Sequence, residues 1–321
     1  MRLEKNRAGR NRTIGLTKRE ADALRPRLLT LDKKAAPEDI AGRIINQDLA
    51  AALPFLPDAF VDLLFIDPPY NLDKKYNSLK FKKSALDDYA AWMESWMSGL
   101  SRLLKPTASI YICSEWQTST AVHLVARKFF KVRNRITWER EKGRGAAANW
   151  KNCAEDIWFC TVSDRYTFDL DAVKLKRRVI APYTGGDGEP KDWERTGGGG
   201  FRLTHPSNIW NDITVPFWSM PENTDHPTQK PEKLLAKLIL ASSKPGDVVF
   251  DPFAGAGTSC VTAKKLGRRF AGVEIDETFC LLAEKRLALA DKDSSIQGYS
   301  DGVFWERNTL QQQKRPPRGK G

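Results

Sequence analysis

Short apolar runs alternate with amphipathic stretches along two separate parts of the chain. In the first part, residues 61–66 (VDLLFI) form an apolar run of the length of a buried strand. Residues 87–104 carry aromatic and leucine side chains at three- and four-residue spacing, which predicts an amphipathic helix capped by Asp87. The same patterns predict a strand at 109–113, a helix near 117–130 and a strand at 135–138. This alternation favours a sheet of parallel strands with helices on both faces.

The part of the chain from 226 to 290 repeats this alternation. It predicts helices at 231–242, 258–266 and 277–290, with strands at 247–250 and 270–273. Residues 139–225 are rich in glycine and weakly periodic, so we expect a loop-rich insertion that the sheet carries. The predicted domain order is a basic N-terminal arm (1–27), a catalytic half-domain (28–138), the insertion (139–225), a cofactor-binding half-domain (226–290) and a C-terminal extension with a basic tail (291–321).

A glycine-rich turn, DPFAGAGT at 251–258, joins a predicted strand to the helix that follows it. Glycines permit a tight turn, and the N-terminus of the helix attracts a carboxylate or a phosphate. Glu274 ends the next predicted strand, 17 residues after Gly257. In nucleotide-binding folds an acidic residue at an offset of roughly 20 residues binds ribose hydroxyls. Only half of the dinucleotide fingerprint is present, so the turn favours a nucleoside with a small charged tail; a purely structural turn is the alternative.

The tetrad Asp67-Pro68-Pro69-Tyr70 directly follows the predicted strand 61–66. Ligands of open α/β sheets bind beyond the carboxyl ends of the strands, where this tetrad would lie. The prolines fix the backbone and have no amide hydrogens of their own. An acid, rigid carbonyl groups and an aromatic ring together suit a flat heterocycle that bears an exocyclic amine. An Asp-Pro turn beside an ordinary core tyrosine is the alternative for the tetrad taken alone.

Together the two motifs resemble the signature pair of the S-adenosylmethionine-dependent amino-DNA methyltransferases. The tetrad precedes the cofactor glycines with a variable region between them, which resembles the beta order of that family. The resemblance runs from about residue 45 to 289 and includes NQD at 46–48, LPDAFVD at 56–62 and HPTQKP at 226–231. It implies an α/β, Rossmann-like methyltransferase fold with circularly permuted motifs and a target-recognition region at 139–225. The implied reaction moves a methyl group to the exocyclic amine of a base flipped out of duplex DNA.

The resemblance also implies roles for individual residues. The carboxylate of Asp67 and the carbonyl of Pro68 would accept the hydrogens of the target amine, and Tyr70 would stack on the base. Trp138 would line the target-base pocket, with core packing as an equal alternative. The implied catalytic set is Asp67, Pro68, Pro69 and Tyr70. The implied cofactor-binding set is Asp48, Asp67, His226, Thr228, Lys230, Asp251, Phe253, Gly255, Gly257, Thr258 and Glu274, with a structural role as the alternative for His226.

The identity of the target stays open at this stage. In the family, Asp at the first tetrad position favours adenine N6, whereas cytosine-N4 enzymes more often carry Ser there. The same geometry serves either amine, so cytosine N4 remains the alternative. RNA and protein amino-methyltransferases share similar tetrads but usually place them after the cofactor glycines. A catalytically inactive DNA-binding relative conflicts with the completeness of both motifs.

The charge of the chain points to an anionic partner. The sequence has 52 Lys and Arg against 40 Asp and Glu, a formal net charge of +12. Most of the excess lies in segments 1–27 and 314–321, which we expect to be mobile arms that follow nucleic acid; solvated ends with no role are the alternative. Expected DNA contacts, including a lysine loop at 74–83, are Lys74, Lys75, Lys80, Lys82, Lys83, Trp138, Arg144, Lys176, Arg177 and Arg178. A solvated surface loop is the alternative for residues 74–83. Duplex DNA is the expected partner; a homodimer and a cognate restriction endonuclease are further partners that the resemblance leaves open.

Several other classes of protein are excluded by the residue types present. None of the five cysteines follows a proline, as the nucleophile of cytosine-C5 methyltransferases does, and they fit packing roles in a reducing cytoplasm. The three histidines lack zinc-ligand spacing, so no metal is expected. The sequence has no apolar run of membrane-spanning length and no signal-peptide pattern. We therefore expect a bacterial cytoplasmic enzyme associated with the nucleoid.

Overall fold

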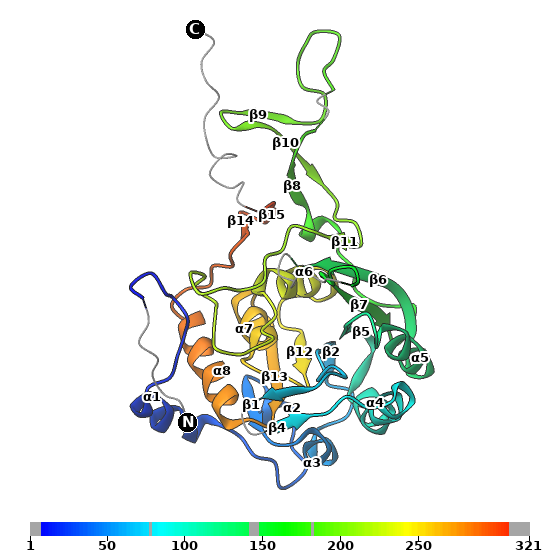
Figure 1. Cartoon of the computed structure of the whole chain (residues 1–321), viewed down its shortest axis with the longest axis vertical. Helices are drawn as coiled ribbons and strands as arrows, with labels where there is room; N and C mark the ends of the chain where they lie inside the picture. Colours follow the sequence, from blue (N-terminus) through cyan, green and yellow to red (C-terminus); the bar gives the residue numbers. More distant parts are fainter. Residues whose placement is uncertain (1–7, 77–78, 141–147, 181–182, 308–321) are drawn as a thin grey trace.

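The computed structural model describes residues 8–76, 79–140, 148–180 and 183–307. An eight-stranded sheet forms its centre, and only β7 runs antiparallel to its neighbours (Figure 1). In spatial order the strands are β1 (Arg43–Asn46), β13 (Arg269–Glu274), β12 (Val248–Asp251), β2 (Val61–Ile66), β5 (Leu104–Ser114), β7 (Ala154–Thr161), β6 (Lys131–Glu139) and β11 (Ile209–Trp210). The predicted mostly parallel sheet is therefore confirmed.

Helices cover both faces of this sheet. Helices α4 (Leu86–Ser101) and α5 (Ser119–Phe129) lie on one face, and α6 (Glu232–Ser242), α7 (Thr258–Lys265) and α8 (Glu277–Ala290) lie on the other. Strand β2 shows how the sequence serves both layers. Leu64 and Ile66 pack on the α4 side and Leu63 and Phe65 on the α6 side, because successive residues of a strand point to opposite faces. Burial on both faces explains why the last four residues of β2, at 63–66, are all apolar.

The ends of some elements differ from the sequence-based expectation. Helix α4 ends at Ser101, not near 104, because the chain turns at Arg102 and β5 begins at Leu104. Ala85 is the N-cap residue of α4, and Asp87 lies in the first turn, where its charge favours the helix dipole. The sequence patterns also missed β7 and β11, which place parts of residues 139–225 inside the central sheet.

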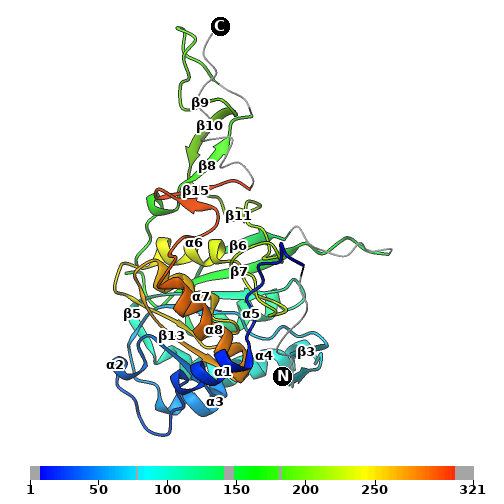
Figure 2. The ribbon, with the colours of Figure 1, turned by 90° about the vertical axis from the view of Figure 1, so that its left-hand side faces the viewer.

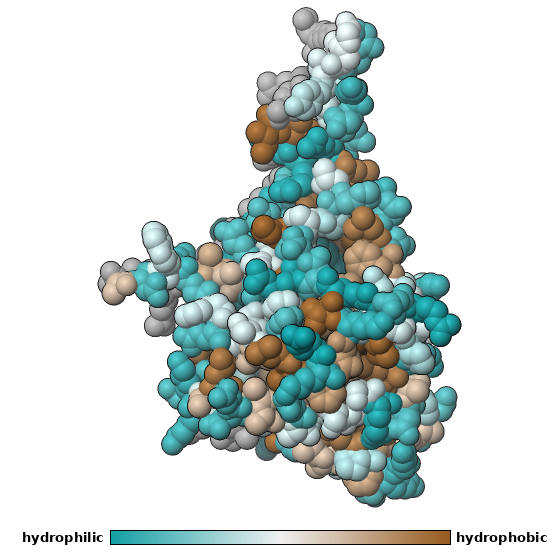
Figure 3. All heavy atoms as spheres, turned by 90° about the vertical axis from the view of Figure 1, so that its right-hand side faces the viewer, coloured by the Kyte–Doolittle hydropathy of each residue, from teal (hydrophilic) through white to brown (hydrophobic). Residues whose placement is uncertain are grey.

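A second, five-stranded sheet projects from the body (Figures 1 and 2). Its order is β14 (Tyr299–Ser300), β15 (Val303–Trp305), β8 (Leu175–Arg178), β10 (Gly199–Thr204) and β9 (Glu194–Thr196). Strands β15 and β8 pair in parallel, so the C-terminal extension and the middle region build one unit. Hydrophilic residues cover most of this projection on the face shown in Figure 3. We call β8, β9, β10, β14 and β15 the projecting sheet.

The N-terminal segment packs against the body. Leu16 and Ala21, the latter in α1 (Lys18–Leu24), are buried against Phe279 and neighbouring residues of α8. Lys285 donates a hydrogen bond of 2.7 Å to the carbonyl oxygen of Gly15. The expectation of a mobile arm at 1–27 is therefore wrong for residues 15–24, because their apolar side chains are buried against α8. Residues 1–7 lie outside the described residues.

The remaining elements are short. They are α2 (Pro37–Ile40), α3 (Leu49–Ala52), the hairpin β3 (Lys74–Tyr76) and β4 (Leu79–Phe81), and three 3₁₀ turns at Arg25–Arg27, Leu53–Phe55 and Asp171–Val173. No helix within the described ranges has both the length and the apolar character needed to cross a membrane.

Candidate active site

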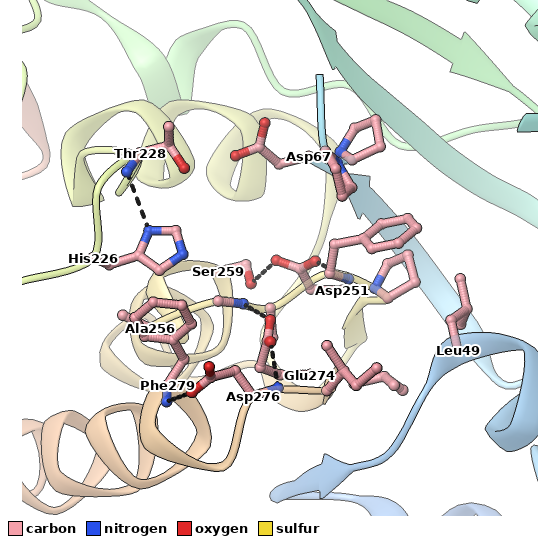
Figure 4. A pocket seen from close by; sticks show the side chains of 18 of the residues that line it. Leu49, Asp67, His226, Thr228, Asp251, Ala256, Ser259, Glu274, Asp276 and Phe279 are labelled. Carbon is pink, nitrogen blue, oxygen red and sulfur yellow. Dashed lines mark hydrogen bonds between the residues drawn. The ribbon is translucent and has the colours of Figure 1, made fainter. Parts of the chain in front are cut away.

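A pocket of about 300 Å³ opens at the carboxyl ends of β2, β12 and β13. The tetrad after β2 and the glycine-rich turn after β12 both line it, so the fold brings together the two motifs. Every residue of the predicted catalytic and cofactor-binding sets lines this pocket except Gly257. In Figure 4, Asp67 lies at one end of the pocket, Glu274 at the other, and Asp251 between them.

At the tetrad end, Lys230 holds the carboxylate of Asp67. Lys230 Nζ lies 2.7 Å from both Asp67 oxygens and 3.2 Å from the Tyr70 hydroxyl. Burial raises the pKa of Asp67, and the positive charge of Lys230 acts against that rise. The pKa of Lys230 is raised, since the charges of Asp67 and Glu155 outweigh the effect of burial. Sequence reasoning placed Lys230 in the cofactor-binding set, whereas its contacts are to the tetrad.

Two residues that the sequence analysis did not select complete this network. The Tyr70 hydroxyl donates a 3.1 Å hydrogen bond to Glu155, whose carboxylate also lies 3.3 Å from Lys230 Nζ. Arg140 binds the other oxygen of Glu155 at 2.8 Å. Because β7 is antiparallel, Glu155 at its start lies at the same sheet edge as the ends of the parallel strands. An acidic residue at the start of a predicted β7 would have been the only signal.

The tetrad is also anchored from α4 and from the loop that precedes that helix. The Tyr89 hydroxyl donates a 3.2 Å hydrogen bond to the carbonyl of Pro69. The side chain of Asn71 accepts a bond from the amide of Ser84 at 2.8 Å and donates one to its carbonyl at 2.9 Å. These contacts add to the stiffness that the two prolines give the backbone.

The glycine-rich turn is built around Asp251. Its carboxylate accepts hydrogen bonds from the Ser259 hydroxyl and, at 2.9 Å, from the amide of Phe253. Burial raises the pKa of Asp251 to about 7, while these two hydrogen bonds act against the rise. At Gly255, where φ is +51°, a Cβ atom would lie 2.9 Å from His226 Nε2. The absence of a side chain there keeps room inside the pocket.

Gly257 serves the packing of two helices. Its φ is +73°, and a Cβ atom would lie 2.6 Å from the Cβ of Ala283 in α8. It forms the N-cap of α7, so glycine there lets α7 start close to α8. Gly257 itself does not line the pocket, which favours a structural role over cofactor contact.

At the far end, Glu274 accepts backbone hydrogen bonds through both carboxylate oxygens. The donors are the amides of Gly255 at 2.9 Å and Asp276 at 2.8 Å (Figure 4). Burial raises the pKa of Glu274, and the bonds from the backbone oppose that rise. Asp48 caps α3 by accepting from the amide of Ala50 at 2.9 Å. Each acid thus shapes its own turn and still presents carboxylate oxygens with further acceptor capacity.

The wall between the two ends carries the remaining predicted residues. The ring of His226 packs edge-on against Phe279 with centroids 4.4 Å apart, and its Nδ1 accepts the amide of Thr228 at 3.4 Å. The Thr258 hydroxyl accepts a 2.9 Å bond from Arg286.

The predicted DNA contacts have different settings. Trp138 is only 1% exposed and donates a 3.1 Å bond to the carbonyl of Ile213, so its predicted place in the target-base pocket is wrong and the core alternative holds. Lys82 and Lys83 are exposed, and Lys83 binds Gln117 at 3.2 Å. The side chains of Lys74, Lys75 and Lys80 and the whole of Arg144 lie outside the described residues.

Three predicted DNA contacts lie on β8 of the projecting sheet. Lys176 pairs with Glu194 at 2.5 Å and Arg177 with Glu306 at 2.9 Å. Arg178 donates to the carbonyl of Gly198 at 3.3 Å. Acidic neighbours therefore offset part of the positive charge on this strand.

Comparison with known proteins identifies the family of this chain, and that family is one that methylates DNA. A family model described as DNA methylase matches residues 61–285. The chain is 33% identical to the DNA adenine methyltransferase YhdJ of Escherichia coli over 262 residues, which cover 79% of this chain and 85% of that protein. The chain belongs to the DNA methylase family. It is also 30% identical to the type II methyltransferase M.HpaI of Haemophilus parainfluenzae over 264 residues, which cover 80% of this chain and 76% of that protein.

Solved structures share the fold of this DNA methylase. The cytosine-N4-specific PvuII DNA methyltransferase matches with a TM-score of 0.56 and 15% identity over 82% of this chain and 93% of that one. TTHA0409 of Thermus thermophilus, complexed with S-adenosyl-L-methionine, matches with a TM-score of 0.53 and 21% identity over 83% of this chain and 98% of that one. The Rossmann-like fold is confirmed, and the family is that of S-adenosylmethionine-dependent DNA amino-methyltransferases.

Proposed function

We propose that this DNA methylase methylates the N6 amine of adenine in duplex DNA. The tetrad begins with Asp67, whose half-buried carboxylate lines the pocket, and this is the observation that carries the proposal. The similar protein YhdJ is named a DNA adenine methyltransferase. Cytosine N4 is the second candidate, because a carboxylate and a carbonyl serve either amine and the PvuII enzyme shares the fold.

The residues of the tetrad act on an amine that is a poor nucleophile, because its lone pair is delocalised into the ring. The Asp67 carboxylate and the Pro68 carbonyl accept its two hydrogens, pull the nitrogen toward tetrahedral geometry and free the lone pair. S-adenosylmethionine, when bound, supplies an electrophilic methyl group on a sulfonium. The nitrogen lone pair forms the new C–N bond, the C–S bond electrons stay on sulfur, and the surplus proton passes to Asp67. Alignment of the two reactants lowers the activation barrier by on the order of 7–11 kcal/mol.

The pocket fits the methyl donor of the family. Glu274 accepts hydrogen bonds from the ribose hydroxyls of S-adenosylmethionine, and Asp48 lies toward its adenine. The turn from Asp251 to Thr258 holds its methionine end. The missing side chain at Gly255 supports this assignment, because a Cβ atom would narrow the pocket beside His226. Five acidic side chains line the pocket (Asp48, Asp67, Asp251, Glu274 and Asp276), which also favours a ligand that carries positive charge.

The DNA lies, in this proposal, across the pocket opening and the projecting sheet. Exposed Lys82 and Lys83 follow the tetrad in the chain and suit phosphate contacts. The projecting sheet is the target-recognition unit, with Lys176, Arg177 and Arg178 at its DNA-facing strand. M.HpaI is named a type II methyltransferase, which supports a cognate restriction endonuclease as the functional partner of this enzyme on nucleoid DNA.

Nucleoside analysis of methylated DNA tests the proposal. Duplex DNA incubated with S-adenosylmethionine and the wild-type enzyme, then digested to nucleosides, should contain N6-methyladenine. Asp67→Ala should give no product while calorimetry still detects binding of the cofactor. Asp88→Ala, an exposed carboxylate on α4, is the matched control and should be fully active. N4-methylcytosine would overturn the choice of base, and an active Asp67→Ala variant would overturn the catalytic assignment.

A further inference from the structure

Four charged side chains from four separate segments meet at the tetrad. Asp67 follows β2, Lys230 precedes α6, Glu155 starts β7 and Arg140 follows β6. Their contacts form one chain, from Asp67 to Lys230, from Lys230 to Glu155 and from Glu155 to Arg140. The cluster contains two carboxylates and two cations, so its formal charges balance.

The burial of this cluster shows that it is a built feature. Lys230 is 6% exposed and Glu155 is 5% exposed. Removing a charge from water costs several kcal/mol unless a partner and further hydrogen bonds compensate for it. Lys230 meets that condition with both oxygens of Asp67, the Tyr70 hydroxyl and Glu155. A cation fixed so closely to Asp67 affects the charge at the tetrad end of the pocket, where the target base would lie.

Asp67 needs two properties to accept hydrogens from an amine. It must be ionised, which burial opposes, and its carboxylate plane must be held toward the target. Lys230 supplies both, because it carries the opposite charge and binds both oxygens at 2.7 Å. Glu155 supplies the next layer, since it binds Lys230 and accepts the hydrogen bond of the Tyr70 hydroxyl. One carboxylate thus orients both the cation on Asp67 and the ring that would stack on the base.

We propose that Lys230 and Glu155 are positioning residues for the target amine, Lys230 holding Asp67 ionised and oriented and Glu155 holding Lys230 and Tyr70. This inference rests on the proposed function of Asp67. It assigns Lys230 to the methyl-accepting end of the pocket, and it gives the start of β7, within residues 139–225, a part in catalysis. Lys230 keeps its proton throughout, and the proton of the amine goes to Asp67.

Substitution of Lys230 is the first test, with single-turnover methyl transfer measured as a function of pH. Lys230→Gln should slow transfer about a hundredfold. It should also move the acid limb of the profile to higher pH, because Asp67 without its cation binds a proton more readily. The other groups facing Asp67 are Glu155, Tyr70, Cys113 and Asp251, and all are unchanged in this variant. Lys230→Arg should restore most of the rate and the acid limb.

Glu155→Gln tests the second layer, because glutamine keeps the size and the acceptor for Tyr70 but loses the charge that holds Lys230. The transfer rate should fall without an upward shift of the acid limb, since the negative charge of Glu155 raises the pKa of Asp67. Glu139→Gln, an exposed residue at the end of β6, is the matched control and should behave as wild type. Cofactor affinity by calorimetry should be unchanged in the variants of Lys230 and Glu155.

Two results would overturn the inference. One is a Lys230→Gln variant with the wild-type rate and pH profile; the other is a loss of rate that weaker cofactor binding explains fully. Asp67→Ala measured alongside separates this inference from the proposed function. An active Asp67→Ala variant refutes the proposed function, whereas an inactive one together with a normal Lys230→Gln variant refutes the positioning role alone.

Discussion

Burial raises the pKa of three acidic side chains in one pocket, Asp67, Asp251 and Glu274. Each is held by a different kind of donor. Asp67 has the ammonium of Lys230, Asp251 has the Ser259 hydroxyl and a backbone amide, and Glu274 has two backbone amides. Only Asp67 therefore depends on a second side chain that is itself charged, which makes its ionisation open to change by a single substitution.

Gly257 gives a prediction for a single residue. Gly257→Ala should destabilise the protein because it forces alanine into a left-handed conformation and places a Cβ atom 2.6 Å from that of Ala283. Gly267 also has φ of +73°, but a Cβ atom there would meet nothing within 4 Å, so Gly267→Ala isolates the backbone effect. We expect the free energy of unfolding to fall by about 1–2 kcal/mol in Gly267→Ala. In Gly257→Ala it should fall by about 1–3 kcal/mol more, because of overpacking. Urea unfolding measures both, and equal losses of stability would show that helix packing at Gly257 is unimportant.

The residues of the tetrad and the glycine-rich turn could be predicted because each motif is continuous in sequence and lies next to a clear apolar strand. Glu155 and Arg140 could not, because their role depends on β7 entering the sheet between β5 and β6. Trp138 is the reverse case, a residue that the sequence selected for the site but that lies outside it. Its position at a strand end suggested the pocket, but the side chain points into the core and the sequence does not record that direction.

At the scale of elements, α6 connects the active site to the projecting sheet. Pro231, the N-cap residue of α6, directly follows Lys230 of the active-site network. One to two turns later, Lys233 and Lys237 both bind the buried carboxylate of Asp212, at 2.7 and 2.8 Å. Lys233 also donates to the carbonyl of Trp305 in β15. The same helix therefore contacts the base of the proposed target-recognition unit and begins directly after Lys230.

Asp212 gives a prediction for this connection. Asp212→Asn keeps the size of the side chain but leaves two buried ammonium groups without a counter-charge. Breaking a buried pair in this way costs about 3–5 kcal/mol. Glu94→Gln is the matched control, because Glu94 pairs with Lys128 on the exposed sides of α4 and α5, where a pair is worth at most about 1 kcal/mol. Urea unfolding measures the loss in the free energy of unfolding for both variants. Similar losses in the two would show that the buried cluster does not hold α6 in place.

The elements of the two half-domains could be predicted, because strong periodicity marks each one. The projecting sheet could not, for two physical reasons. Its strands are only two to six residues long, so they carry little alternation. Its pairing of Phe304 with Leu175 also joins residues far apart in the chain, which no local pattern reveals.

At the scale of the whole molecule, the net charge of +12 is unevenly distributed. Segment 1–27 carries nine basic and three acidic residues, and segment 314–321 carries four basic and no acidic ones. The body between them is nearly neutral, and the projecting sheet pairs two of its cations, Lys176 and Arg177, with Glu194 and Glu306. We therefore expect the shape of the site to supply the specific part of DNA binding, and the charge at the two ends to add affinity that salt can screen.

Neutralising the basic residues near each end tests that division of roles. We expect a variant in which four basic residues become Gln (Lys314, Arg315, Arg318 and Lys320) to bind DNA more weakly. The slope of the logarithm of the binding constant against the logarithm of salt concentration should flatten by about 0.9 for each phosphate that is no longer neutralised.

The double variant Arg10→Gln with Arg12→Gln should act in the same direction without unfolding the N-terminal segment, since both side chains are exposed whereas Leu16 is buried against α8. Deleting residues 1–16 should instead lower the Tm, because it removes Leu16 and the hydrogen bond between Gly15 and Lys285. Fluorescence anisotropy at several salt concentrations measures the slope. A slope that stays unchanged in both Gln variants would show that the positive ends do not touch DNA.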